Sequence, residues 1–182
     1  MTEISDRYRR RAATMTDRIA RVAEDGWDAA TPCEGWTVTD LVQHLVDTTG
    51  MFLGFIGKDP PGGPSVTDDP VGAFAAARQA MQAALDEPAT AGQGYDGLFG
   101  PTTLEQSVDG FLSVDLVIHG WDLARATGQD EGMDPDDVRR VHEALQPMGD
   151  KLRSPGAFGP EIEPPSGADA QTRLLCFLGR PA

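Results

Sequence analysis

The segment Val114–Ala126, VDLVIHGWDLARA, places three groups that can bind a proton or a metal inside an apolar stretch. Asp115, His119 and Asp122 are separated by four and three residues, so on a helix their side chains lie on one face, roughly one turn apart. That face continues upstream through residues that we expect to point into a core: Leu104, Val108 and Phe111. Burying an unpaired carboxylate and an imidazole there would cost several kcal/mol, on the order of the stability of a small domain. A bound divalent metal ion or a hydrogen-bonded polar cluster would offset this cost.

A second inward histidine is predicted on the helix that follows Thr37. Thr37 has the character of an N-cap, with Asp40 three residues later as a carboxylate variant of the capping box. The helix is expected to run to about Ile56, and one stripe on it comprises Leu41, His44, Thr48, Met51 and Phe55, with Leu45 and Phe52 beside it. His44 therefore points inward or nearly so. A lone inward histidine is more often a hydrogen-bonded core residue than a ligand, so its interest comes from the cluster around His119.

Together, His44, Asp115 and His119 would supply two imidazoles and one carboxylate from facing helices, as metal sites in helical bundles do. Asp115 and His119 share the i, i+4 spacing with which two helical histidines bind zinc in metalloproteases. Two imidazoles and one carboxylate are a known catalytic zinc set with an open position for water, and nickel or iron accepts the same donors. We therefore predict a metal site in preference to a purely structural polar cluster, and we assign no catalytic residue.

Asp122 and Cys33 each allow more than one interpretation. Asp122 either orients the His119 ring by accepting its second N–H, or it bonds a backbone amide or Arg125. Cys33, in the loop Trp27–Trp36, is a soft metal ligand, a reactive thiol or a structural residue. Because Cys33 and Cys176 are the only cysteines and lie far apart in sequence, a disulfide framework is not expected.

The composition describes an acidic globular protein. Its 182 residues suit one domain with a proper core, or one domain with a short appendage, and the formal net charge is −14. Such a surface repels phosphate backbones and anionic lipids, so we expect neither a nucleic-acid nor a membrane partner. No apolar run reaches the roughly 20 residues of a membrane span, the N-terminus does not resemble a signal peptide, and cysteine is scarce. We expect a cytoplasmic protein.

The apolar periodicity predicts an all-α fold, an up-down four-helix bundle with a short helical C-terminal extension. We expect the bundle in residues 1–130 and the extension, packed on the same domain, in residues 131–182. The long helices are placed at about 5–24, 37–56, 70–87 and 103–127, and shorter ones follow Asp134 and Ala168. Gly57–Pro70 and Ala89–Pro101 are expected to be loops that shape a substrate cleft, the second with a short extended stretch. The basic run of Arg7, Arg9, Arg10 and Arg11 is expected on a solvated outer face.

Two segments, TPCEGWTVTDLVQHL and DLVIHGWDLARATG, resemble a known family. They are similar to the actinobacterial metal-binding proteins related to the N-terminal domain of mycothiol-dependent maleylpyruvate isomerase, in the DinB-like superfamily. The resemblance implies a four-helix bundle that holds a divalent ion, zinc first and nickel as the alternative, at His44, Asp115 and His119. It also implies mycothiol as a thiol cofactor that the metal activates. The isomerase has a glutamate where this chain has Asp115, so the shorter side chain requires a closer helix approach or a bridging water.

Three hypotheses follow. In the first, the protein is a metal-dependent thiol transferase or isomerase whose partners are a small-molecule thiol and a small electrophile. In the second, it is a non-catalytic metal-binding or stress-response module with the same ligands. In the third, His44, Asp115 and His119 form only a polar cluster. A homodimer is compatible with the apolar and aromatic content of the bundle, although no residue specifies it.

Overall fold

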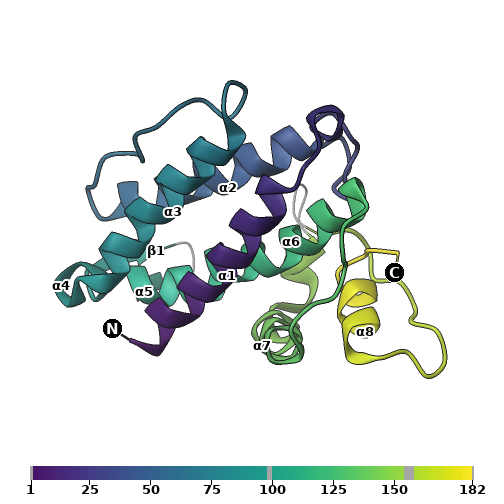
Figure 1. Ribbon diagram of the computed structural model, residues 1–182. Coiled ribbons are helices and arrows are strands. Elements are labelled where there is room, and N and C mark those ends of the chain that lie inside the picture. The colour runs from purple at the N-terminus through teal and green to yellow at the C-terminus, as the bar shows by residue number, and fades with distance from the viewer. Residues whose placement is uncertain (1, 98–99, 154–157, 182) are drawn as a thin grey trace. The chain divides into compact units, whose positions relative to one another are not determined.

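The computed structural model describes residues 2–97, 100–153 and 158–181, which belong to two compact units, Met1–Glu131 and Gly132–Ala182 (Figure 1). The first unit contains four long helices: α1 (Glu3–Ala20), α2 (Val38–Phe55), α3 (Pro70–Asp86) and α6 (Ser113–Thr127). Shorter elements lie between α3 and α6: α4 (Pro88–Ala91), strands β1 (Gly94–Gly97) and β2 (Gly100–Thr103), and α5 (Leu104–Ser107). The predicted all-α class is therefore confirmed, with one small hairpin added.

The second unit is also helical. It contains α7 (Pro135–Leu145), the 3-10 segment Gln146–Arg153 and α8 (Ala170–Phe177). Asp134 caps α7 by accepting hydrogen bonds from the amides of Asp136 and Asp137, as its sequence predicts. The start of the predicted irregular segment, residues 154–157, lies outside the described residues, and the packing of this unit on the bundle stays a prediction.

Local capping chemistry sets the ends of the helices that carry the site. Thr37 and Asp40 form the predicted capping box, because Thr37 Oγ1 accepts from the Asp40 amide at 3.2 Å and Asp40 Oδ2 accepts from the Thr37 amide at 2.9 Å. At the far end of α6, Gly128 has φ of +66°, the left-handed conformation in which glycine commonly ends a helix. These caps fix where the site-bearing helices start and stop.

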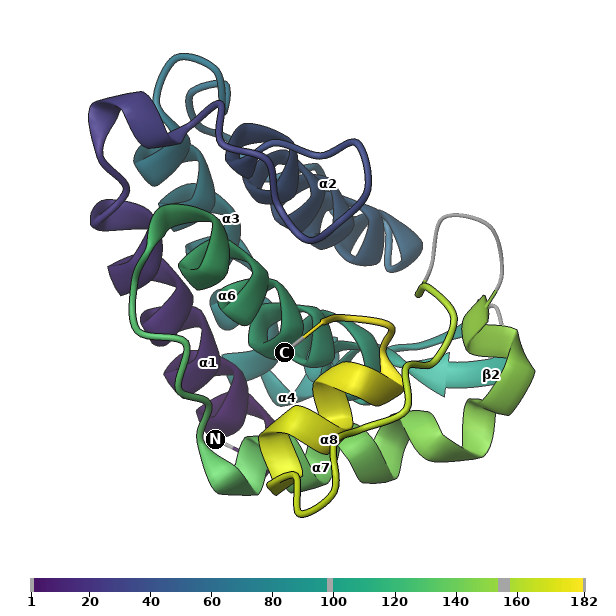
Figure 2. The same ribbon diagram turned by 90° about the vertical axis from the view of Figure 1, so that its right-hand side faces the viewer.

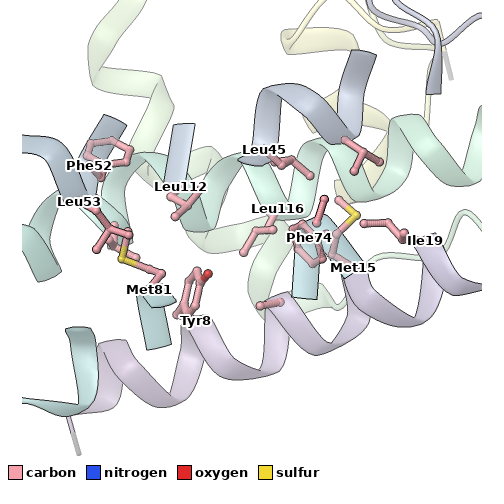
Figure 3. Close-up of a cluster of buried hydrophobic side chains, with 14 of the residues drawn as sticks. Tyr8, Met15, Ile19, Leu45, Phe52, Leu53, Phe74, Met81, Leu112 and Leu116 are labelled. Atoms are coloured by element: carbon pink, nitrogen blue, oxygen red, sulfur yellow. The ribbon is translucent and has the colours of Figure 1, made fainter. Parts of the chain in front are cut away.

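The four long helices enclose the core. α1 packs against α3 and α6, and α2 packs against the same two helices, so α1 and α2 lie diagonally across the bundle (Figure 2). Side chains from all four helices and from the segment before α6 meet in the centre, among them Tyr8, Leu45, Phe74, Leu112 and Leu116 (Figure 3). Because successive helices α1 and α2 are not neighbours, the connection over residues 21–37 has to cross from one side of the bundle to the other.

The helix predicted from Thr103 to Thr127 is continuous but not uniform. Val108–Leu112 is a π-helical turn, in which each turn of helix takes up more residues than in an α-helix. The buried stripe therefore runs through Leu104, Val108, Leu112 and Leu116. Phe111, which regular spacing predicts to be in the core, is 37% exposed. The expectation for Phe111 was wrong because the wider turn shifts the register.

The stripe predicted on α2 is divided in a similar way. Leu41 and Leu45 are fully buried, whereas Met51 is 46% exposed and Phe55 is 43% exposed. The core instead takes Val42, Thr49 and Leu53 from the adjacent face of the helix. The outer residues of the predicted stripe border a cavity, described below.

The arginine run on α1 is not wholly solvated. Arg7 and Arg11 are buried at 6% and 5% exposure, while the side chain of Arg9 is 40% exposed. Arg7 donates to both carboxylate oxygens of Asp109 at 2.8 and 3.0 Å, and Arg11 donates to the Ser113 carbonyl at 3.3 Å. The outer-face expectation was wrong for these two residues because they bind α1 to the π-helical turn and the start of α6.

The helices that the structure describes were compared with the requirements of a membrane span. Within residues 2–97, 100–153 and 158–181, no helix combines the length and the apolar character needed to cross a bilayer.

Candidate metal centre

Three potential ligands converge between α2 and α6. His44 comes from the second turn of α2, and Asp115 and His119 lie one turn apart on α6. Each of the three offers a nitrogen or oxygen atom, and these atoms all lie within 4.8 Å of one another. His44 Nε2 and Asp115 Oδ2 are 3.4 Å apart. The structure thus brings together the three residues that the sequence predicts as metal ligands.

The burial of the cluster is graded. The side chains of His44 and Asp115 are 32% and 24% exposed, whereas that of His119 is 10% exposed. The cluster is therefore closed on the His119 side and accessible on the side of His44 and Asp115. This gradient suits a site that a small molecule approaches from one direction.

Asp122 fixes the orientation of the innermost ring. It is completely buried, and its Oδ2 lies 3.0 Å from His119 Nδ1. A proton on Nδ1 would be donated to this carboxylate, which leaves the lone pair on Nε2 for a ligand bond. Histidines that bind metals commonly have this carboxylate partner behind the ring.

A tight turn brings Cys33 to the rear of the same imidazole. The Trp36 amide donates to the Cys33 carbonyl at 3.0 Å, and Gly35 in the turn has φ of +77°, a conformation that glycine adopts without strain. The thiol lies 3.4 Å from Asp122 Oδ2 and 3.8 Å from His119 Nδ1. Cys33, His119 and Asp122 therefore form a second group that could hold a metal ion, and it shares His119 with the first.

Trp36 packs beside both histidines. Its ring centroid lies 4.9 Å from that of His44 and 5.9 Å from that of His119, and the two imidazole centroids are 5.1 Å apart. The indole covers this side of the cluster with apolar surface. Low local polarity strengthens electrostatic interactions between a cation and its ligands.

The chemistry of the donors fits a divalent ion. Ligand bonds of about 2.1 Å arranged tetrahedrally place neighbouring donor atoms roughly 3.4 Å apart. The 3.4 Å between His44 Nε2 and Asp115 Oδ2 matches this separation and exceeds the usual 2.7–3.2 Å hydrogen-bond range. Whether Asp115 would bind the ion directly or through a bridging water stays a prediction.

A cavity of about 370 Å³ opens at the accessible side of the cluster. His44 and Asp115 form one end of it, and its walls come from α2, from the β1–β2 hairpin and from the helical segment that contains Phe111. The hairpin confirms that the loop Ala89–Pro101 helps to shape a cleft. The other expected loop, Gly57–Pro70, contributes no residue to the lining, although the structure describes all of it.

Sequence reasoning missed the aromatic residues of the site. Trp36 comes just before the capping box of α2, which is a signal that its indole lies near the helix start. Phe55 and Phe111 were attributed to the core, and Tyr95, in the hairpin, carried no periodic signal at all. Of the alternatives for Asp122, the contact with His119 is present.

Comparison with known proteins places these residues in a wider context. The family model described as the mycothiol maleylpyruvate isomerase N-terminal domain matches residues 8–124. Two relatives, the uncharacterised proteins Rv0738 and MT0763 from two strains of Mycobacterium tuberculosis, are each 34% identical to the chain over 169 residues, 89% of both chains. No solved structure matches. The matched range contains every residue of the candidate centre.

Proposed function

The chain belongs to the mycothiol maleylpyruvate isomerase N-terminal domain family, and we propose that it binds a divalent metal ion and uses it in thiol chemistry on a small electrophile. His44, Asp115 and His119 would be the ligands, and Asp122 would hold His119. The observation that carries this proposal is the convergence of the three donor atoms within 4.8 Å at the end of a cavity.

The side chains around the proposed metal centre have different roles. Asp122 would keep the Nε2 of His119 directed to the ion, and Trp36 packs against both imidazoles. A bound divalent ion would act as a Lewis acid that lowers the pKa of a coordinated thiol and so supplies a thiolate. Zinc is our first choice and nickel the alternative, since mixed nitrogen and oxygen donors accept both.

The cavity favours an enzyme over a non-catalytic metal-binding module. A module that only holds a metal has no use for a space of about 370 Å³ that begins at two of the ligands. A transferase needs such a space, because the electrophile has to lie against the thiolate sulfur. We propose mycothiol as the thiol, because the family to which the chain belongs is described as a mycothiol maleylpyruvate isomerase domain.

A thiol-consumption assay tests the catalytic half of the proposal. Metal-loaded protein is incubated with mycothiol and one electrophile at a time: an aryl halide, an epoxide or an α,β-unsaturated ketone. The thiol that remains is then titrated. With 1-chloro-2,4-dinitrobenzene, for example, a carbon–sulfur bond forms, chloride leaves and the thiol proton passes to buffer. We expect loss of thiol above the rate without protein, and the rate without protein for His119→Ala. Stoichiometric metal with no thiol consumption for any electrophile would contradict a transferase; it would leave an isomerase, which regenerates its thiol, or the non-catalytic module.

A further inference from the structure

The wall of the cavity is built from aromatic side chains. Phe52 and Phe111 have ring centroids 6.4 Å apart and planes inclined by 25°, and Phe55 and Tyr95 have centroids 5.2 Å apart and planes inclined by 27°. All four of these residues line the cavity. Aromatic side chains contribute large apolar contact area and pair favourably with other aromatic rings.

Two of these rings, those of Phe55 and Phe111, are left exposed. Of the five most exposed large hydrophobic side chains in the described part of the chain, Met51, Phe55 and Phe111 all line this cavity. Contact of apolar surface with water is unfavourable. Exposed apolar side chains that cluster around one cavity therefore indicate a binding site, whereas singly scattered ones do not. The volume of about 370 Å³ lies within the roughly 300–1,000 Å³ of pockets for small organic ligands.

Neutral hydroxyl groups provide the polar contacts away from the metal ligands. Tyr95 Oη lies 2.5 Å from Ser107 Oγ, which lies 3.3 Å from Thr102 Oγ1. All three residues line the cavity. A cluster of hydroxyls can donate to a carbonyl, nitro or hydroxyl oxygen without requiring a charge on the ligand.

The charges present oppose an anionic ligand. Asp115 contributes a carboxylate to the lining, and no lysine or arginine occurs among the lining residues that the structure describes. In the metal-free protein, a ligand carboxylate here would lose water without gaining a cationic side chain, and it would face Asp115. The chain's net charge of −14 adds to this repulsion.

We infer that this cavity binds the electrophile as a planar, mainly aromatic compound of about two rings, and that without a metal ion it prefers a neutral compound to a carboxylate. Its role as a substrate rests on the proposed function, but its binding does not require the metal. The aromatic pairs hold the ring system, and the hydroxyl cluster or the open end at His44 and Asp115 receives its polar group.

Binding of two matched probes to chelator-treated protein tests the inference. At pH 7, 2-naphthol is neutral and 2-naphthoate is ionised, while both have the same ring system. We expect isothermal titration calorimetry to give a dissociation constant lower for 2-naphthol by roughly tenfold or more. Equal or tighter binding of 2-naphthoate would overturn the inference, as would no binding of 2-naphthol.

Three variants locate the binding and probe its charge preference. Thr48→Trp fills the cavity and should abolish 2-naphthol binding, while circular dichroism reports whether the helices remain. Met51→Lys adds a cation to the lining and should shift the preference toward 2-naphthoate. Val71→Lys, on an exposed α3 position outside the cavity, is the matched control and should change neither constant. Folded Thr48→Trp with unchanged 2-naphthol affinity, or equal effects of the two lysines, would contradict the assignment.

The metal content of the same samples before chelation separates this inference from the proposed function. A protein that binds 2-naphthol but takes up no metal retains the cavity assignment and loses the metal chemistry. A protein that takes up metal but not 2-naphthol loses the cavity assignment and retains the centre.

Discussion

His119 is the residue on which both candidate ligand groups depend. It belongs to one group with His44 and Asp115 and to a second group with Asp122 and Cys33. Because Nδ1 is 3.0 Å from the buried Asp122 carboxylate, the geometry favours the first pair for the ion and gives the second pair a supporting role. Cys33 would then be a neighbour of the centre and not a ligand.

Two substitutions distinguish these roles. Asp122→Asn should weaken metal affinity by roughly 10- to 100-fold, because the carboxylate no longer fixes the His119 ring. Cys33→Ser, which keeps the size and the hydrogen-bonding capacity, should leave the affinity unchanged. Competition with a chromophoric chelator measures both constants. Loss of metal in Cys33→Ser, together with retention in His44→Ala, would instead identify Cys33, His119 and Asp122 as the ligands.

The ligand candidates could be predicted from the sequence because polar residues at helical spacing stand out within an apolar stretch. Asp115, His119 and Asp122 needed only the period of the α-helix, and His44 needed only a second amphipathic stripe. The position of Cys33 was not accessible in this way, since it depends on a turn around Gly35 and on a loop that crosses the bundle. Contacts of that kind join residues far apart in sequence and have no periodic signature.

At the scale of elements, the π-helical turn Val108–Leu112 determines which residues reach the cavity. Regular α-helical spacing puts Phe111 and Asp115 in the core, whereas the wider turn gives the core positions to Leu112 and Leu116. Phe111 and Asp115 consequently face the cavity. Phe111 is as apolar as Leu112, so the period alone could not decide which of these two residues enters the core.

The contact between α1 and the end of α3 predicts an acid-sensitive part of the stability. Asp86 accepts from Ser5, from Gln82 and from Arg9, and these bonds, led by that from Ser5, hold the pKa of its carboxyl below the ordinary value. A lowered pKa in the folded state means that this stabilisation is complete above the ordinary value and is lost as the pH falls through the folded value.

Asp86→Asn isolates this contribution. We expect the variant to unfold at a lower temperature than the wild type at pH 7, and we expect the difference to shrink as the pH falls below about 3.9. Thermal unfolding followed by circular dichroism across this range measures the difference. Asp47→Asn, which removes one exposed carboxylate on α2, serves as the charge-matched control away from α1. A difference that stays constant with pH would contradict the assignment.

At the scale of the whole molecule, charge is the dominant property. A formal net charge of −14 on 182 residues creates self-repulsion that favours expansion of the chain. Raising the salt concentration from 0.01 to 0.1 M shortens the screening length from about 30 to about 10 Å. We therefore expect the unfolding temperature to rise by a few degrees over this range, measured by differential scanning calorimetry on metal-free protein. A fall in the unfolding temperature would contradict the argument.

The helical class of the molecule followed from composition and period, but the arrangement of its helices did not. The amphipathic stripes do not predict that α1 and α2 lie diagonally across the bundle. A stripe indicates which face of a helix is buried, but it does not indicate which helix covers that face. That arrangement makes residues 21–37 cross the bundle and places Trp36 against His44 and His119. The position of Trp36 beside the candidate metal centre therefore depends on how the helices are connected.

The central claim is that His44, Asp115 and His119 hold one divalent ion, and elemental analysis tests it most directly. Wild-type protein reconstituted with zinc and freed of excess metal should contain about one ion per chain. His44→Ala and His119→Ala should contain almost none, while His142→Ala, which removes the third histidine of the chain from α7, should retain the wild-type content. Wild-type protein without metal, or His44→Ala and His119→Ala with undiminished metal, would contradict the account.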